Sequence, residues 1–163
     1  MNLTYDIFND ILETRKPFVK KQEYPIDLPD DLYERIDKIL CEFKPRYQTI
    51  IKLRYKDKKT FTEISEEVGL GRNTVHENIG RVLKQIGRKH FLYITNQKLS
   101  FDTSIYDLNL RLNVLAALHS GGCETIRDLL DCDVSRCTRG GNVTAKRVEE
   151  LIQQVKTMQI NEA

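Results

Sequence analysis

Five polar side chains between positions 72 and 77 carry groups that can recognise base pairs through hydrogen bonds. They combine a guanidinium, an amide, a hydroxyl, an imidazole and a carboxylate within six residues. Side chains of these types pair with the base edges exposed in the major groove of DNA when one helix presents them together. The sequence therefore predicts a DNA-reading helix whose contact residues are Arg72, Asn73, Thr74, His76 and Glu77.

The residues before and after the start of this run have the pattern of a helix-turn-helix. Thr60 and Glu63 have the spacing of a capping box, which predicts the start of a short helix. Gly69 can adopt the left-handed backbone conformation that ends such a helix. A second helix is expected from about residue 72 to residue 89, and the tight turn would present it to the major groove. Its expected buried face consists of Val75, Ile79, Val82 and Ile86.

Basic residues are concentrated in the same part of the chain. The 163 residues have a net charge of +2, but residues 37–98 alone carry +7, while residues 1–36 and 99–163 carry −3 and −2. This segregation indicates an anionic partner for the middle of the chain, and double-stranded DNA is such a partner.

A wider set of residues matches the pattern of a known family. The matching residues are Pro45-Arg46-Tyr47, Ile50-Ile51, Leu53-Arg54-Tyr55, Phe61, Glu63-Ile64, Gly69-Leu70, Arg72, Thr74-Val75 and Arg81-Val82-Leu83. Through them, residues 30–90 resemble region four of bacterial sigma factors, which binds the −35 element of promoters and the flap of the RNA polymerase β subunit. The resemblance implies that the five polar residues lie on a recognition helix. It also implies that Arg81, Lys84 and Arg88 complete the DNA-binding set, with Lys84 and Arg88 facing phosphates.

The sequence departs from this family in three respects. Gly71 stands where the family usually has a serine or threonine cap, which predicts a weaker start of the recognition helix. Asn78 and Gly80 predict that this helix is less regular. Residues 1–29 are too few and too acidic for the aromatic-rich domain with which a complete sigma factor holds the −10 element. We therefore expect that the chain does not open promoters alone.

The C-terminal third is expected to form several short helices around a small core. Gly140-Gly141-Asn142 predicts a bend before a helix that carries Lys146 and Arg147, which resembles a helix-hairpin-helix. In that element the backbone N–H groups at a helix N-terminus bind a phosphate. The other expected helices span residues 108–118 and 125–130, followed by a short turn capped by Asp133 and a last helix over residues 144–155.

The same stretch resembles the C-terminal domain of the RNA polymerase α subunit. The matches are Asp107-Leu108, Leu112, Leu118, Ile126, Asp128-Leu129, Asn142, Lys146 and Glu150-Leu151. The resemblance implies DNA contacts from Asn142, Thr144, Lys146 and Arg147. However, Asn113, Thr144 and Arg147 stand where the family has an arginine, a glycine and a serine. Minor-groove binding and protein contacts therefore remain two alternatives for this domain.

The four cysteines, in a chain without an apolar signal segment, are expected to be reduced thiols in the cytoplasm. His119, Cys123, Cys132 and Cys137 match zinc patterns only loosely, because they include no C-x-x-C pair. Since Cys123 and Cys137 fall on core positions of short helices, we expect buried thiols there and no metal site. Motifs of catalysis are also not found, so the sequence predicts neither an enzyme nor a cofactor.

Together these patterns predict an all-α protein with a sigma-region-four-like helix-turn-helix domain and a small helix-hairpin-helix-type domain that resembles the C-terminal domain of the polymerase α subunit. The expected segments are a helical lead-in (residues 1–29), the first domain (30–90), a linker (91–104), the second domain (105–157) and a tail (158–163). The leading hypothesis is a transcription regulator that binds promoter DNA together with RNA polymerase. The alternatives are an adaptor that binds the β flap or a sigma factor without reading DNA, and a general DNA-binding protein of a mobile element. Neither a membrane nor a small-molecule substrate is expected as a partner.

Overall fold

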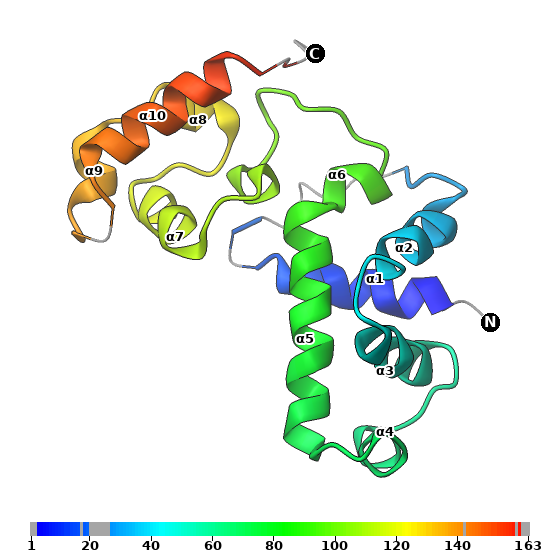
Figure 1. Cartoon of the computed structure of the whole chain (residues 1–163). Helices are drawn as coiled ribbons and strands as arrows, with labels where there is room; N and C mark the ends of the chain where they lie inside the picture. The colour runs from blue at the N-terminus through cyan, green and yellow to red at the C-terminus, as the bar shows by residue number, and fades with distance from the viewer. Residues whose placement is uncertain (1–2, 17, 20–26, 142, 159, 161–163) are drawn as a thin grey trace. The chain divides into compact units, whose positions relative to one another are not determined.

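The structure is a computed structural model that describes residues 3–16, 18–19, 27–141, 143–158 and 160 (Figure 1). Regular structure in this part of the chain is helical, apart from one isolated β-bridge between Ser104 and Thr125. The predicted all-α class is therefore confirmed. The chain divides into two compact units, which are described separately below.

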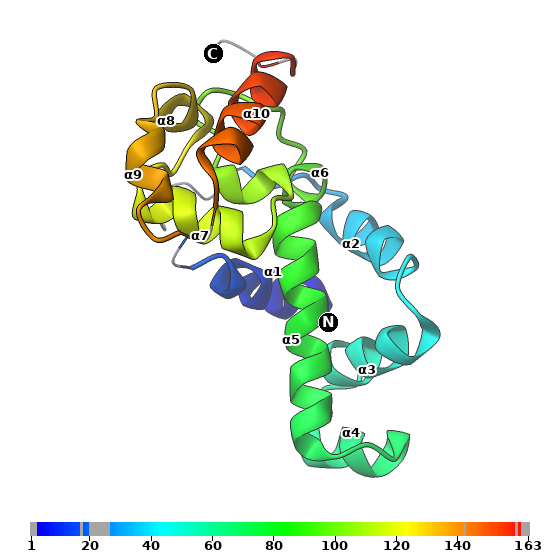
Figure 2. The same cartoon turned by 60° about the vertical axis from the view of Figure 1, so that its left-hand side comes forward.

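The first unit contains residues 3–16 and 27–96. Its apolar core is formed mainly by isoleucine, leucine and valine side chains from every helix of the unit. The 18-residue helix α5 runs through this unit, and α4 lies across its N-terminal end (Figure 2). The helices are α1 (Leu3–Thr14), α2 (Leu32–Leu40), α3 (Pro45–Tyr55), α4 (Phe61–Val68), α5 (Arg72–Lys89) and α6 (Phe91–Ile94).

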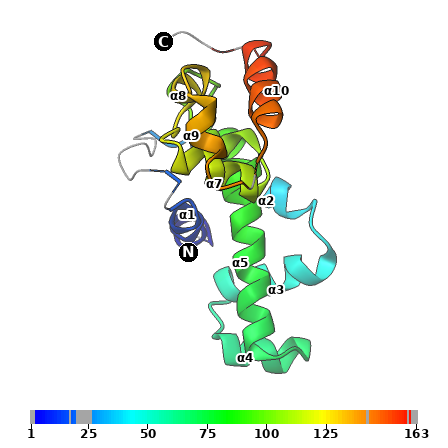
Figure 3. The same ribbon diagram turned by 90° about the vertical axis from the view of Figure 1, so that its left-hand side faces the viewer.

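Helix α1 is part of this core and not a separate lead-in. It crosses α5, as the views in Figures 1 and 3 agree, and its Ile7 and Ile11 side chains are completely buried. Gly87 of α5 permits this close crossing, because a Cβ atom there would lie 2.8 Å from Oγ1 of Thr14. Arg15 then donates a hydrogen bond of 2.8 Å to the Gly87 carbonyl. The sequence predicted a helical lead-in over residues 1–29 without a packing partner for it, and the structure packs its helix into the core of the first unit.

The segment expected as a linker, residues 91–104, is also divided between the two units. Phe91 and Ile94 of α6 are buried in the core of the first unit. Leu99 and Phe101 pack against the core of the second unit. The connection between the cores is therefore much shorter than the expected linker, because apolar side chains at both of its ends are buried.

The second unit contains residues 18–19 and, from residue 97 onward, residues 97–141, 143–158 and 160. Its helices are the 3-10 helix η2 (Ile105–Leu108), α7 (Leu112–Ser120), α8 (Ile126–Leu130), α9 (Val134–Thr138) and α10 (Ala145–Lys156). Helix α10 packs beside α8 and α9 (Figure 2). Val19 also belongs to this core, with only 3% of its surface exposed.

The predicted helix over residues 108–118 is wrong at its N-terminal end. The Ser104 hydroxyl accepts a hydrogen bond from the Tyr106 N–H and starts a separate 3-10 helix. Asn109 then adopts a left-handed conformation with φ of 58°, which ends that helix, and α7 begins only at Leu112. Asparagine tolerates this conformation better than most residues, and a helix cannot continue through it.

The other short helices of the second unit follow their predicted starts. Thr125 forms a capping box with Asp128 at the start of α8, and Asp133 caps α9 through the Ser135 N–H. The Thr144 hydroxyl accepts a hydrogen bond of 3.2 Å from the Arg147 N–H at the start of α10. These local caps matter because helices of five residues are too short to be stable alone.

Candidate nucleic-acid interface

Helices α4 and α5 form the predicted helix-turn-helix. Both hydrogen bonds of the capping box between Thr60 and Glu63 are present at the start of α4. Gly69 ends α4 in the left-handed conformation, with φ of 72°. The Ser65 hydroxyl donates a hydrogen bond to the carbonyl of Leu70, which fixes the turn between the helices. Local hydrogen bonds thus determine where α5 begins.

The rotation of α5 about its own axis is fixed by its buried face. Val75 and Ile86 are completely buried, and Val82 is 1% exposed. Because a helix repeats every 3.6 residues, burial of this face leaves the other side of α5 in contact with solvent. The residues left exposed include all five predicted base-reading side chains, Arg72, Asn73, Thr74, His76 and Glu77, and also Arg81 and Lys84, while Arg88 is half-buried.

Asn78 and Gly80 do not interrupt α5, so the predicted irregularity is wrong. The helix runs without a break from Arg72 to Lys89. Asn78 is 5% exposed, and the structure gives no hydrogen-bond partner for its Nδ2 atom within the described residues. Tertiary packing of the apolar face overrides the low helix propensity of these two residues.

The start of α5 leaves backbone N–H groups without an internal partner. Gly71 is the N-cap residue and provides no side-chain hydrogen bond to the first turn. The first N–H groups of any helix lack intrahelical acceptors, and together with the helix dipole they favour an anion. This feature, which the sequence predicted as a weak helix start, also suits a helix that meets DNA phosphates.

His76 is positioned by an aromatic contact with the preceding helix. Its ring meets the Phe61 ring edge-on, with centroids 5.0 Å apart. The Arg54 guanidinium lies 4.3 Å from the centroid of Phe61 and donates a hydrogen bond to the Lys59 carbonyl. These contacts restrict His76 to one region at the start of α5. Arg54 is therefore a positioning residue that sequence reasoning did not identify.

A second group of cations lies where α3 meets α5. Arg46 and Arg81 each place a guanidinium nitrogen 3.4 Å from the hydroxyl oxygen of Tyr47. The hydrogen bonds from these two guanidinium groups, and then their positive charges, stabilise the phenolate, so the pKa of Tyr47 is lowered from its ordinary value. Sequence reasoning placed Arg81 at the DNA but did not connect it with Arg46, because the two residues are far apart in the chain.

The structure describes three of the four residues that were predicted to contact DNA from the second unit. Thr144, Lys146 and Arg147 are exposed at the start of α10, whereas Asn142 lies outside the described residues. Arg147 and Thr144 line a cavity of about 380 Å³ together with Arg111 and Asn113. Because Arg111 and Thr144 are the N-cap residues of α7 and α10, this cavity lies beside two helix N-termini, and the guanidinium of Arg147 lies 4.0 Å from a carboxylate oxygen of Glu150. The arrangement suits a phosphate group.

The expected thiol positions are also present. Cys123 and Cys137 are buried, with 2% and 3% of their surfaces exposed, as the sequence predicted. Burial raises the pKa of the Cys123 thiol and raises that of Cys137 to about 11. The His119 ring instead packs edge-on against Phe18, with centroids 5.7 Å apart.

Comparison with known families gives one match. Residues 40–88 match the family model for Sigma-70, region 4, and this segment contains α3, α4 and nearly all of α5. A search of curated proteins and a search of solved structures each gave no match. No helix in the described ranges is long and apolar enough to cross a membrane. Residues 40–88 thus form a helix-turn-helix similar to region four of sigma-70 factors, and the match supports DNA binding in transcription.

Proposed function

We propose that this chain is a transcription regulator that reads a promoter element through α5 and acts together with RNA polymerase. The observation that carries the proposal is the exposed polar face in the N-terminal half of α5, held on a capped helix-turn-helix within residues 40–88. The net charge of +7 over residues 37–98 supports the same partner, because cations release counterions from DNA.

In this proposal α5 lies in the major groove with its N-terminal end at the bases. Arg72 suits bidentate pairing with guanine, Asn73 suits adenine, and Glu77 suits the amino group of cytosine. Thr74 and His76 complete this reading set. Arg81, Lys84 and Arg88 contact phosphates and set the register of the protein on the duplex. Arg46 adds a further phosphate contact, because Tyr47 links it to Arg81.

The second unit would add a sequence-independent phosphate contact beside the promoter element. The cavity between the N-termini of α7 and α10 supports this part of the proposal, and Lys146 lies on the same helix as Arg147. The predicted contact from Asn142 remains a prediction from the sequence. A fold like that of the C-terminal domain of the polymerase α subunit likewise remains a proposal, which the short capped helices of this unit support.

A second candidate function is an adaptor that binds the polymerase flap or its sigma factor without reading DNA. A groove of about 670 Å³ between α2 and α3 favours this alternative. Leu40 lies in this groove, and the charged residues Asp37, Lys52 and Lys56 surround it. Leu40 is only 5% exposed, so the groove offers a partner mainly charged and polar side chains, which suit a protein surface of complementary charge.

One experiment separates the two functions. The full chain is used to select preferred sequences from random duplex DNA, and the double variant Arg72→Ala/His76→Ala is tested in parallel. Each good bidentate contact is worth about 1–3 kcal/mol of discrimination, so the double variant should lose most sequence preference while it still binds DNA non-specifically. Lys38→Ala, which removes an exposed cation from α2, is the matched control and should select the same sequences as the unaltered protein.

The adaptor function predicts the opposite result. In that case the unaltered protein selects no sequence, and capture of core RNA polymerase continues after nuclease treatment. Capture should then fall in Lys52→Glu, which reverses a charge at the rim of the groove, and not in the Arg72/His76 variant.

A further inference from the structure

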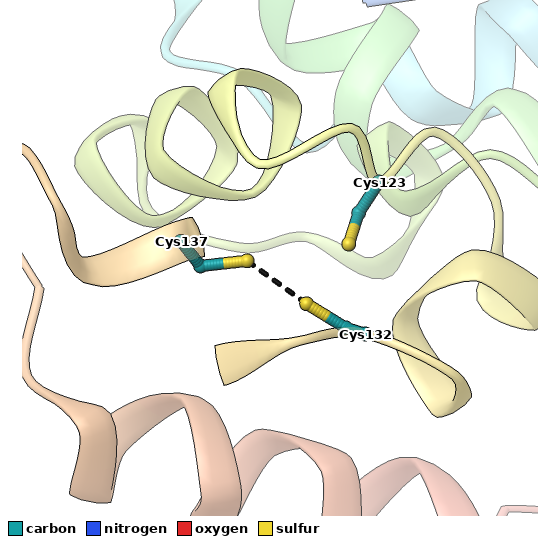
Figure 4. A group of neighbouring side chains, drawn as sticks. All are labelled: Cys123, Cys132 and Cys137. Atoms are coloured by element: carbon teal, nitrogen blue, oxygen red, sulfur yellow. Dashed lines mark hydrogen bonds between the residues drawn. The ribbon is translucent and has the colours of Figure 1, made fainter. Parts of the chain in front are cut away.

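Three of the four cysteines meet in the second unit. Cys123 lies between α7 and α8, Cys132 follows α8, and Cys137 belongs to α9. Figure 4 shows their side chains directed toward one another from these three segments. The three sulfur atoms all lie within 4.8 Å of one another, and those of Cys132 and Cys137 are 2.9 Å apart.

This separation suits coordination of a single metal ion. A zinc–thiolate bond is about 2.3 Å long, so two sulfur ligands of a tetrahedral ion are about 3.8 Å apart. The 2.9 Å between the sulfur atoms of Cys132 and Cys137 is shorter than that value, and no separation in the group exceeds 4.8 Å, so side-chain rotations can bring all three sulfur atoms to ligand spacing. Cysteine thiolates select soft ions such as Zn²⁺ and Cu⁺ over hard ions such as Mg²⁺ and Ca²⁺.

We propose that Cys123, Cys132 and Cys137 form a binding site for one thiophilic metal ion, held by three thiolates with a fourth position open to an external ligand. Binding of a divalent ion replaces three S–H protons, which pass to solvent, and no electron is transferred. The complex of three thiolates with a divalent ion carries one net negative charge. The sequence predicted no metal here, because His119, Cys123, Cys132 and Cys137 include no C-x-x-C pair and because Cys123 and Cys137 fall on core positions.

Access and charge around the cluster support this site. A cavity of about 320 Å³ opens beside Cys137, and Arg136 and Arg139 line it. Both arginines are exposed and can offset the negative charge of the thiolate complex. Gly121 also lines the cavity, and a Cβ atom there would lie only 2.6 Å from the Cys137 sulfur. The absence of a side chain at Gly121 therefore provides the space in which the Cys137 sulfur lies.

The position of the cluster gives the ion a structural role. The three cysteines belong to the ends or loops of α7, α8 and α9, and both α8 and α9 have only five residues. A metal ion bound to all three segments would cross-link them, as structural zinc sites do in other small domains. We expect that the bound ion raises the unfolding midpoint of the second unit.

The test uses the reduced full chain, freed of metal by a chelator and titrated with Co²⁺ without oxygen. We expect one equivalent to bind with a thiolate-to-cobalt charge-transfer band, and Zn²⁺ to displace the cobalt. Cys132→Ser should weaken binding at least about 10-fold, because even residues outside the ligand shell change metal affinity by about 10–100-fold. Cys132 is half-buried and is the least disruptive ligand to replace. Cys41→Ser, which removes the exposed cysteine of the first unit, is the control and should bind metal normally.

A second measurement needs no variant. In the unaltered protein, Zn²⁺ should slow alkylation of Cys123, Cys132 and Cys137, as read by peptide mass spectrometry, and leave the rate at Cys41 unchanged. The proposal is overturned if no metal binds, if Cys132→Ser binds as tightly as the unaltered protein, or if Zn²⁺ protects Cys41 equally. A disulfide between Cys132 and Cys137 in freshly isolated protein that contains no metal would also overturn it, in favour of a redox pair.

Discussion

The two units obtain their structure from different kinds of sequence information. In the first unit, the 18-residue helix α5 is positioned by a continuous apolar face that packs against α1, α3, α4 and α6. In the second unit, α8 and α9 have five residues each, and side-chain caps define where they begin. A long helix presents a regular series of side chains to a partner. Short capped helices instead bring together residues such as the three cysteines, which lie in separate segments.

The largest expected difference between the two units comes from truncating one core side chain in each of them. Ile64→Ala and Leu129→Ala each truncate a side chain that is completely buried, the first in α4 and the second in α8. Each change should destabilise its own unit by about 2–5 kcal/mol, because it leaves a cavity. Amide hydrogen exchange resolves the two units. Only Ile64→Ala should also abolish DNA binding, so equal loss of binding in Leu129→Ala would show that the second core carries the interface.

The two capping boxes offer a matched test of smaller size. Thr60→Ala removes the cap of α4, and Thr125→Ala removes that of α8. Each should cost about 1 kcal/mol in the local unfolding free energy measured by hydrogen exchange. We expect the Thr125 variant to have wider effects within its unit, since α8 has only five residues. If Thr125→Ala lowers hydrogen-exchange protection in α8 alone, the expected difference between the units is contradicted.

Salt dependence compares the two proposed phosphate contacts. On a short duplex that carries only the selected site, Lys84→Gln should make the negative slope of log K against log salt shallower by about 0.9. This amounts to an affinity difference of about 3-fold over a 4-fold change in salt. Lys146→Gln should leave the slope unchanged on the same duplex. Equal slopes for the two variants would place the second unit on the same binding site as α5.

The smallest expected change in stability concerns the N-cap residues of α5 and α10. Gly71→Ser gives α5 a capping hydroxyl, and its backbone φ of −63° accepts any side chain. Thr144→Gly removes the existing cap of α10. Since serine or threonine caps exceed glycine by only a few tenths of a kcal/mol, the first unit should become slightly more stable and the second slightly less. Hydrogen exchange of the first turn of each helix measures both changes.

Sequence reasoning succeeded where the structure depends on local contacts. The ends of α4 follow from Thr60, Glu63 and Gly69, and the span of α5 follows from its apolar period. It failed at Asn109, whose left-handed conformation no spacing of apolar residues reveals. The roles of the exposed residues of α5 remain predictions, because exposure permits a DNA contact without demonstrating it.

Contacts between distant segments could not be predicted in the same way. The hydroxyl of Tyr47 meets Arg81 across 34 positions of sequence. The cysteine cluster depends on how α7, α8 and α9 are oriented relative to one another. The spacing of the three cysteines in the sequence does not give the distances between their sulfur atoms. One signal was available for the packing of α1, namely the apolar spacing of Ile7, Phe8 and Ile11. It would have placed α1 against another helix but would not have identified Gly87.

The burial of Val19 means that the second unit is built from two separate segments of the chain. Ile11 and Leu32, on either side of it in the chain, belong to the core of the first unit, whereas Val19 belongs to that of the second. The polypeptide therefore contributes to the second core early and returns to it only after residue 97. A simple fusion of two independent cassettes would not have this connectivity. Transfer of residues 97–163 alone to another protein would leave the Val19 position of the second core empty, so a stable second unit is expected to require the segment that contains Val19 as well.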